Sequence, residues 1–267
     1  VAEGATAIVN GRDEGRTRKT AEEIDGPGRA VPVHGDVGSK EGVEEFLDRL
    51  SSVGNIDILV NNAGIFEPTP FFDIPDEDWF KFYEINVMSG VRLSRALAPG
   101  MKDRGWGRIF FISSESGIRI PEEMIHYGVT KTAQLALVRG IAKTLQGTGV
   151  TVNAVLPGPT WTEGVSEFVE KMAKQEGVST EEMRKEFVPR FRPTSIIQRF
   201  AEPEEVAAMV AYLSSPLASA TTGAAIRVEG GLVDEQDAAP TACGRFLSRL
   251  ESRPLPRQKI WATNFAI

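Results

Sequence analysis

Short apolar runs alternate along the chain with longer segments whose apolar residues recur at helical spacing. The apolar runs predict buried strands at 5–9, 30–33, 56–60, 107–112, 151–156 and 225–228. The longer segments predict helices at 13–24, 39–52, 76–98 and 124–146, with a break near Pro99 and Gly100. Such alternation indicates βαβ units, and right-handed crossovers then place helices on both faces of the sheet. We therefore predict a three-layer α/β fold with a doubly wound, mostly parallel, Rossmann-like sheet.

The segment 162–198 departs from this alternation. Two charged, amphipathic helical stretches follow one another there without a strand between them. An insertion of about thirty residues at the carboxyl end of a strand favours a pocket lid over a plain connector. Arg190 and Arg192 could meet an anionic group of a substrate, and a solvated charge is the alternative. We expect the apolar underside of the lid to consist of Phe168, Met172, Met183, Phe187 and Phe191.

Composition narrows the class of protein without specifying a chemistry. Of 267 residues, 41% are hydrophobic and 25% are charged, as in a globular domain with one sizeable core. A net charge of −7 argues against nucleic acid or an anionic membrane as the main partner. No apolar run reaches the roughly 18 residues needed to span a bilayer. One cysteine and two histidines provide no internal disulfide and no metal-ligand spacing, and without a secretory leader we expect a cytoplasmic protein.

Candidate chemistry gathers in the stretch 113–131. Tyr127 and Lys131 are four residues apart, so on a helix their side chains share a face, where an ammonium favours the phenolate. A free tyrosine has a pKa of about 10, and a neighbouring cation brings this value toward one useful for proton transfer. Ser114 follows the strand at 107–112, at the carboxyl end where open α/β sheets place ligands. The three residues indicate chemistry on a carbonyl or hydroxyl, although a Tyr–Lys pair alone also occurs by chance on exposed helices.

Several motifs in a fixed order make residues 1–233 similar to one known family. They are Asn61-Asn62-Ala63-Gly64, Asn86, Ser114, Tyr127-x-x-x-Lys131, Asn153 and Pro157-Gly158-x-Thr160. Each motif is weak by itself, and their conjunction is specific. On these residues the chain resembles the short-chain dehydrogenase/reductase family. The resemblance implies an oxidoreductase that transfers a hydride between a nicotinamide cofactor and a small carbonyl or alcohol.

The same resemblance implies catalytic roles for four residues. Tyr127 would be the general acid in reduction and the base in oxidation. Lys131 would lower the pKa of Tyr127 and bond the nicotinamide ribose, and Ser114 would hold the substrate oxygen close to the phenol. Asn86 would hold a water molecule that links Lys131 to solvent. The structural alternatives are a buried hydroxyl, a helix-surface charge and a satisfied amide.

On the adenine side of the implied cofactor site, Asp36 matches the acidic residue whose carboxylate bonds the adenine amine, and Val37 adjoins it. A loop carboxylate that caps a helix is the alternative for Asp36. Arg12 follows the first strand, where a 2′-phosphate would lie, and no acid stands at Asn10 or Gly11 to bond a 2′-hydroxyl. This pattern favours NADP over NAD, with a plain solvated charge as the alternative for Arg12.

The turn from Asn61 to Gly64, with Asn62, Ala63 and Gly64 as its implied contact residues, would pass its backbone against the adenine ribose, and Gly64 permits close approach. Thr160 would contact the nicotinamide carboxamide. The remaining residues implied to contact the cofactor are Pro157, Gly158, Tyr127 and Lys131.

Residues around the catalytic stretch leave more than one interpretation open. His126 faces away from Tyr127 by helical geometry, so we expect it at the pocket rim or in an interface. Met124, Ile118 and Ile120 could line the substrate site or belong to the core. The family resemblance also implies a homodimer or homotetramer built on the helices at 76–98 and 124–146.

Two departures from the family pattern separate two hypotheses. The strand, the T-G-x-x-x-G-x-G turn and most of the helix that open a family member have no counterpart before Gly4, and the strand would be central in the sheet. Residues 234–267 extend past the usual end, and we predict a disordered tail, or alternatively a strand at 259–267 in the vacated position. The first hypothesis is an NADP-linked enzyme. The second is a catalytically silent remnant that acts at most as an assembly or binding partner.

Overall fold

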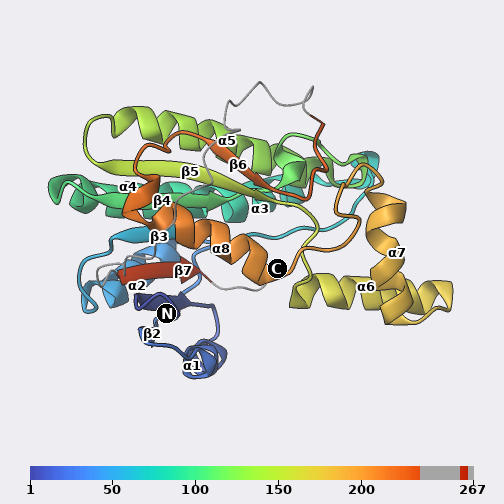
Figure 1. Ribbon diagram of the computed structural model, residues 1–267, viewed down its shortest axis with the longest axis horizontal. Coiled ribbons are helices and arrows are strands. Elements are labelled where there is room, and N and C mark those ends of the chain that lie inside the picture. Colours follow the sequence, from blue (N-terminus) through green and yellow to red (C-terminus); the bar gives the residue numbers. More distant parts are fainter. Residues whose placement is uncertain (235–258, 264–267) are drawn as a thin grey trace.

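The computed structural model describes residues 1–234 and the backbone of residues 259–263. In the described ranges seven strands form one sheet in the order β2-β1-β7-β3-β4-β5-β6, and every neighbouring pair is parallel (Figure 1). The strands are β1 (Thr6–Asn10), β2 (Arg29–Pro32), β3 (Ile58–Asn61), β4 (Gly107–Ile112), β5 (Val150–Pro157), β6 (Ala225–Val228) and β7 (Lys259–Thr263). The parallel Rossmann-like sheet predicted from the sequence is confirmed.

Helices complete the three layers. The helices are α1 (Glu14–Glu23), α2 (Lys40–Ser51), α3 (Asp76–Tyr83), α4 (Ser89–Asp103), α5 (Ile125–Thr144), α6 (Glu163–Glu176), α7 (Thr180–Phe191) and α8 (Pro203–Ser214). One cluster of buried side chains joins α2, α4 and α5 to one face of the sheet, and a second joins α8 to the other face. None of the helices within residues 1–234 is both long and apolar enough to cross a membrane.

Local sequence signals set most helix ends, with one correction. Ser39 caps α2 by accepting a hydrogen bond from the Gly42 amide at 3.1 Å, and Pro203 occupies the first turn of α8. The predicted break at Pro99 is wrong, because α4 runs through this proline to Asp103. Proline removes only one backbone donor, and the fully buried Met101 holds the next turn against the core.

The central strand β7 comes from the far end of the chain. Residues 259–263 pair with 6–10 of β1 on one side and residues 260–262 pair with 58–60 of β3 on the other. In the family pattern this position belongs to the first strand. The alternative prediction of a strand from the end of the chain in this position is therefore confirmed for residues 259–263. The predicted disordered tail otherwise falls on 235–258 and 264–267, which lie outside the described residues.

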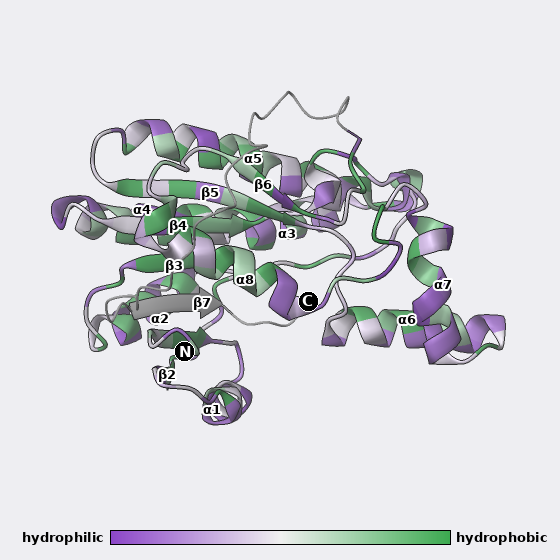
Figure 2. Cartoon of the chain, in the orientation of Figure 1, coloured by the Kyte–Doolittle hydropathy of each residue, from purple (hydrophilic) through white to green (hydrophobic). Residues whose placement is uncertain are grey.

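Helices α6 and α7 form a separate lobe beside the carboxyl ends of the strands (Figure 1). The lobe has its own buried cluster, in which Val169 and Val188 are fully enclosed. Hydrophilic residues mark the outer parts of both helices, whereas β3, β4 and β5 are largely hydrophobic (Figure 2). Amphipathic helices with an enclosed apolar side are what the sequence predicts for a lid.

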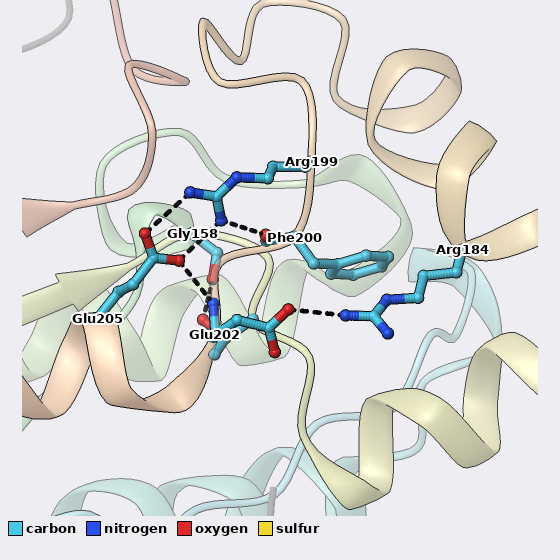
Figure 3. A network of polar contacts seen from close by, with 7 residues as sticks. Gly158, Arg184, Arg199, Phe200, Glu202 and Glu205 are labelled. Atoms are coloured by element: carbon cyan, nitrogen blue, oxygen red, sulfur yellow. Dashed lines mark hydrogen bonds and ion pairs between the residues drawn. The ribbon is translucent and has the colours of Figure 1, made fainter. Parts of the chain in front are cut away.

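The base of this lobe is tied to α8. Arg184 of α7 pairs with Glu202 at 2.7 Å, and Arg199 binds both carboxylate oxygens of Glu205 at 2.7 and 2.9 Å (Figure 3). A parallel bridge between Thr160 and Ala201 joins the two ends of the segment. Both ends of the lobe are therefore fixed close to the carboxyl end of β5.

Candidate active site

A pocket of about 760 Å³ lies between the carboxyl ends of the strands and the lid. Ser114, after β4, and Tyr127, on α5, line its inner wall, and the segment that follows β5 lines another side. Its lid side is apolar and aromatic. The aromatic residues there are Trp161, Phe168, Phe187, Phe191 and Phe200.

Lys131 lies below Tyr127 on the same face of α5. Its ammonium is 5.4 Å from the centroid of the Tyr127 ring and donates a hydrogen bond of 2.9 Å to the Ile112 carbonyl at the end of β4. The side chain is 3% exposed, and burial lowers the pKa of Lys131 to about 8. The ammonium is thus held in a fixed place at the end of the strand and stays largely protonated at pH 7.

The phenol of Tyr127 has a pKa well above its ordinary value. Burial is the main cause, the carboxylate of Glu115 adds to it, and the Ser114 hydroxyl opposes it. Lys131 is not among the groups that shift this pKa, and its ammonium bonds the Ile112 carbonyl, so its effect on the phenol stays a prediction. The phenol is accordingly a proton donor as it stands.

Asn86 lies in a π-helical turn, Glu84–Met88, inserted between α3 and α4. Its side chain accepts from the Ile65 amide at 2.7 Å and donates to the Thr130 hydroxyl at 3.0 Å, which locks the loop after β3 onto α5. Its main-chain carbonyl accepts a bond of 2.6 Å from Gln134. A π turn frees main-chain groups from the helix ladder, and such turns are frequent at functional sites.

The turn after β3 passes directly above these side chains. A methyl group added at Gly64 would lie 3.4 Å from the Asn86 side-chain oxygen and 3.6 Å from the Lys131 ammonium. Asn62 lines the pocket, and Ala63 and Gly64 are half-buried beside it. The backbone at Gly64 therefore lies close to the Lys131 ammonium, at the site.

The residues after β5 also meet the pocket. Pro157, Gly158 and Thr160 all line it, and the Thr160 hydroxyl donates to the Gly158 carbonyl at 2.9 Å. A methyl group at Gly158 would lie 2.8 Å from the Glu229 carbonyl, so this turn requires glycine. These three predicted residues therefore share the pocket with Ser114 and Tyr127.

The predicted adenine-side residues lie apart from this group, near the ends of β1 and β2. Arg12 and Asp36 are exposed, and the Asp36 carboxylate accepts from the Gly38 amide at 3.0 Å. Ser39, not Asp36, caps the following helix. Val37 is 5% exposed and belongs to the core beneath α2, so its side chain does not face the surface.

The lid residues are only partly where the sequence places them. Phe168, Met172, Phe187 and Phe191 line the pocket as expected, whereas Met183 is enclosed in the lobe's own core. Arg190 and Arg192 reach the pocket already paired, the first with Glu176 at 2.6 Å and the second with Glu123 at 2.9 Å.

The residues around Tyr127 occupy different environments. Met124 lines the pocket, Ile118 packs against the core and Ile120 is exposed. His126 is at neither the rim nor a surface. It is 1% exposed, its ring centroid lies 4.0 Å from that of Phe82 with the rings tilted, and burial lowers its pKa.

Sequence reasoning missed three contributors to the site. Glu115 is buried in the pocket beside Ser114, Trp161 lines the lid side, and Gln134 binds the carbonyl of Asn86. Glu115 had a signal, because it is a charged residue directly after an apolar strand and a candidate serine. The other two depend on contacts between segments distant in sequence.

Comparison with known proteins places the chain in a family. A family model described as enoyl-(acyl carrier protein) reductase matches residues 1–233. The uncharacterized oxidoreductase YvaG of Bacillus subtilis (strain 168) is 47% identical over 234 residues, covering 86% of this chain and 88% of the relative. The chain belongs to the short-chain dehydrogenase/reductase family.

Solved structures of family members agree with this placement. L-sorbose reductase from Gluconobacter frateurii, complexed with NADPH and L-sorbose, has a TM-score of 0.80 at 28% identity, covering 86% of this chain and 96% of that chain. A 7 alpha-hydroxysteroid dehydrogenase complexed with NADH and 7-oxo glycochenodeoxycholic acid has a TM-score of 0.73 at 30% identity and covers 86% of both chains. The family thus includes oxidoreductases complexed with either nicotinamide nucleotide.

Proposed function

We propose that this chain is an NADP(H)-preferring reductase or dehydrogenase of a small carbonyl or alcohol. The observation that carries the proposal is the convergence of Ser114 and Tyr127 at one wall of the pocket, with the Lys131 ammonium close to the Tyr127 ring. A hydroxyl and a phenol at the pocket wall can hold and protonate a substrate oxygen, and a buried ammonium close to the phenol can assist this step. Among the described residues no cluster of metal ligands competes for this role.

The chain's residues fit a nicotinamide cofactor, which supplies or accepts the hydride when bound. The Gly64 turn leaves space above Asn86 and Lys131 that a side chain would fill. Thr160 and the turn before it would contact the nicotinamide end, and Arg12 and Asp36 would contact the adenine end. Lys131 would hold the ribose nearest the reacting ring.

The proton steps follow from the positions of the side chains. In reduction, Ser114 donates a hydrogen bond to the substrate carbonyl, which polarises it, and Tyr127 gives its proton to the same oxygen. Lys131 stabilises the phenolate that remains, and Asn86 positions the loop and helix that enclose it. In oxidation the phenolate accepts the proton of the alcohol.

A preference for NADP(H) is supported by charge. Arg12 is exposed just after β1, and neither Asn10 nor Gly11 carries an acid that would bond a 2′-hydroxyl and repel a 2′-phosphate. Asn10 instead uses its side-chain amide to bond the Val33 and Gly35 carbonyls at 3.0 and 3.1 Å. A guanidinium binds phosphate with charge-assisted hydrogen bonds.

We also propose that the chain assembles as a homodimer or homotetramer through α3, α4 and α5. This is supported by exposed apolar side chains on those helices, among them Phe80 at 75%, Tyr83 at 46% and Val129 at 44%. Light scattering that gives the mass of a single chain would contradict the assembly without affecting the proposed chemistry.

The competing hypothesis is a folded but inactive family member. It is favoured by the exposed positions of Arg12 and Asp36, the residues proposed to bind the nucleotide. Titration of the chain with NADPH, followed by cofactor fluorescence, separates the two. We expect saturable binding, and no fluorescence change with protein that is folded by far-UV circular dichroism would refute the enzyme.

A further inference from the structure

Glu115 is a carboxyl group enclosed beside the proposed catalytic serine. It is 6% exposed and lies in the short η3 turn (Glu115–Gly117) that follows β4. One oxygen, Oε2, is hydrogen-bonded to the Ser114 hydroxyl. The other, Oε1, accepts a bond of 3.2 Å from the Ser116 hydroxyl. Neither the family motifs nor the proton steps above use this group.

The hydrogen bonds of Ser114 depend on the protonation state of Glu115. A serine hydroxyl has one proton to donate and two lone pairs. One lone pair of Ser114 already accepts the Ser116 amide at 3.1 Å. If Glu115 is ionised, it can only accept, so Ser114 gives its single proton to Glu115 and has none for a substrate. If Glu115 is protonated on Oε2, it donates to the second lone pair, and the proton of Ser114 can point to Tyr127 or to a substrate oxygen.

We propose that Glu115 is a positioning residue that carries a proton during catalysis and thereby directs the Ser114 proton to the substrate oxygen. The hydrogen bonds then run from Glu115 to Ser114 and from Ser114 to the carbonyl oxygen. Neither Glu115 nor Ser114 transfers its proton along these hydrogen bonds, because Tyr127 supplies the proton that the product gains. The inference rests on the proposed function, in which Ser114 contacts the substrate.

The surroundings of Glu115 suit the neutral form. Burial raises the pKa of Glu115, and the hydrogen bond from Ser114, the charge of Arg192 and two hydrogen bonds from Ser116 act against this rise. Arg192 is already paired with Glu123 at 2.9 Å, which weakens its attraction. From α5, Tyr127 and Lys131 also face the carboxyl group. The remaining charged residues that line the same pocket are Glu122, Glu163 and Arg190.

A neutral Glu115 also helps Tyr127. An ionised carboxylate at this place raises the pKa of the Tyr127 phenol and opposes formation of the phenolate. Protonation of Glu115 removes this repulsion. Protonation of Glu115 therefore favours both the hydrogen bond that Ser114 donates to the substrate and the proton transfer from Tyr127.

The protonation state can be measured without any turnover. Infrared titration of the folded protein should show the C=O stretch of a protonated carboxyl group at pH 7, and Glu115→Gln should remove it. As a matched control, Glu77→Gln changes an exposed glutamate of α3 and should leave that band in place. A band that is absent at pH 7 and appears only below pH 5, or a pH 7 band that survives in Glu115→Gln, overturns the proposal even if no substrate is found.

The pH profile then tests the role. With NADPH and L-sorbose or a 7-oxo bile acid as probe, wild-type kcat/KM for reduction should fall about tenfold per pH unit above the pKa of Glu115. Glu115→Gln keeps a donor that cannot ionise, so this limb should vanish and kcat/KM at the alkaline end should exceed wild type by about tenfold. In a Ser114→Ala background the same change should lose the part of its effect that acts through Ser114, and only the smaller effect of the Glu115 charge on Tyr127 should remain. An alkaline limb that Glu115→Gln leaves unshifted overturns the proposal. If no probe is reduced, the proposed function is in question, and the infrared result still decides the state of Glu115.

Discussion

The half of the sheet around β4, β5 and α5 differs from the half around β1, β2 and β7. In the first, Lys131 and Asn86 are buried, and each is held by hydrogen bonds between neighbouring elements. In the second, Arg12 and Asp36 are exposed and the central strand comes from the far end of the chain. The proton-transfer groups are thus built into the core, whereas the groups proposed to select the nucleotide stand at the surface.

This difference predicts that substitutions in the two halves act on different quantities. Changes in the buried half should alter the chemical step, because the groups are fixed before any ligand arrives. Changes at the exposed half should alter nucleotide choice, and changes in β7 should alter the stability of the whole sheet.

The largest effect is expected for Tyr127→Phe, which keeps the ring and removes only the proton that the substrate gains. We expect kcat to fall about 10³-fold while the Kd for NADPH changes by less than about twofold. Steady-state kinetics and fluorescence titration measure the two quantities. Tyr212→Phe, on the exposed side of α8, is the matched control. Full activity in Tyr127→Phe would remove the phenol from the mechanism.

The next effect concerns β7. Ala262→Pro removes a backbone donor from a strand that is paired on both sides, so we expect the free energy of unfolding to fall by about 3 kcal/mol or more. Urea unfolding followed by circular dichroism measures this change. Ala262→Gly keeps the donor and should cost only about 1 kcal/mol. Equal stability of the proline variant and the wild type would mean that β7 does not hold the sheet together.

Lys131 should make the stability depend on pH. Its pKa falls from 10.5 to about 8 on folding, so the unfolded chain takes up this proton first as the pH drops. As the pH falls from 10.5 to about 8, the unfolded chain gains this proton before the folded one. The free energy of unfolding therefore falls over this range, by at most about 3 kcal/mol. Lys131→Met should abolish this slope in urea unfolding between those pH values. A slope that persists in the variant would assign it to another group.

The smallest effect is expected at the exposed edge. Arg12→Ala should lower kcat/KM for NADPH about tenfold, which corresponds to the loss of one charge-assisted contact, and leave NADH nearly unchanged. Arg18→Ala is the matched control, because this arginine is also exposed and pairs with Glu14. An equal loss with both nucleotides would show that Arg12 does not discriminate between them.

The sequence predicts best where a structure depends on local pattern. The strands at 107–112 and 225–228 have the predicted bounds, and Ser39 caps its helix as expected. The central position of β7 was only an alternative, because a five-residue strand is fixed by partners distant in sequence. The π turn at Asn86 has no sequence signature.

The candidate site follows the same division. Ser114, Tyr127 and Lys131 meet as predicted, since one strand end and one helix face bring them together. The pKa of Tyr127 could not be predicted from Lys131 alone, because burial and the neighbouring Glu115 dominate it. Charge and solvation at a buried group depend on every element packed around it.

The most direct test of the central claim is to follow the hydride itself. The chain is incubated with NADPH deuterated at the transferable position and with L-sorbose or a 7-oxo bile acid, and the alcohol product is analysed by mass spectrometry. We predict one deuterium on the former carbonyl carbon with the wild type and none with Tyr127→Phe over the same time. Folded protein that binds NADPH and transfers no deuterium to any carbonyl tested would contradict the proposed activity.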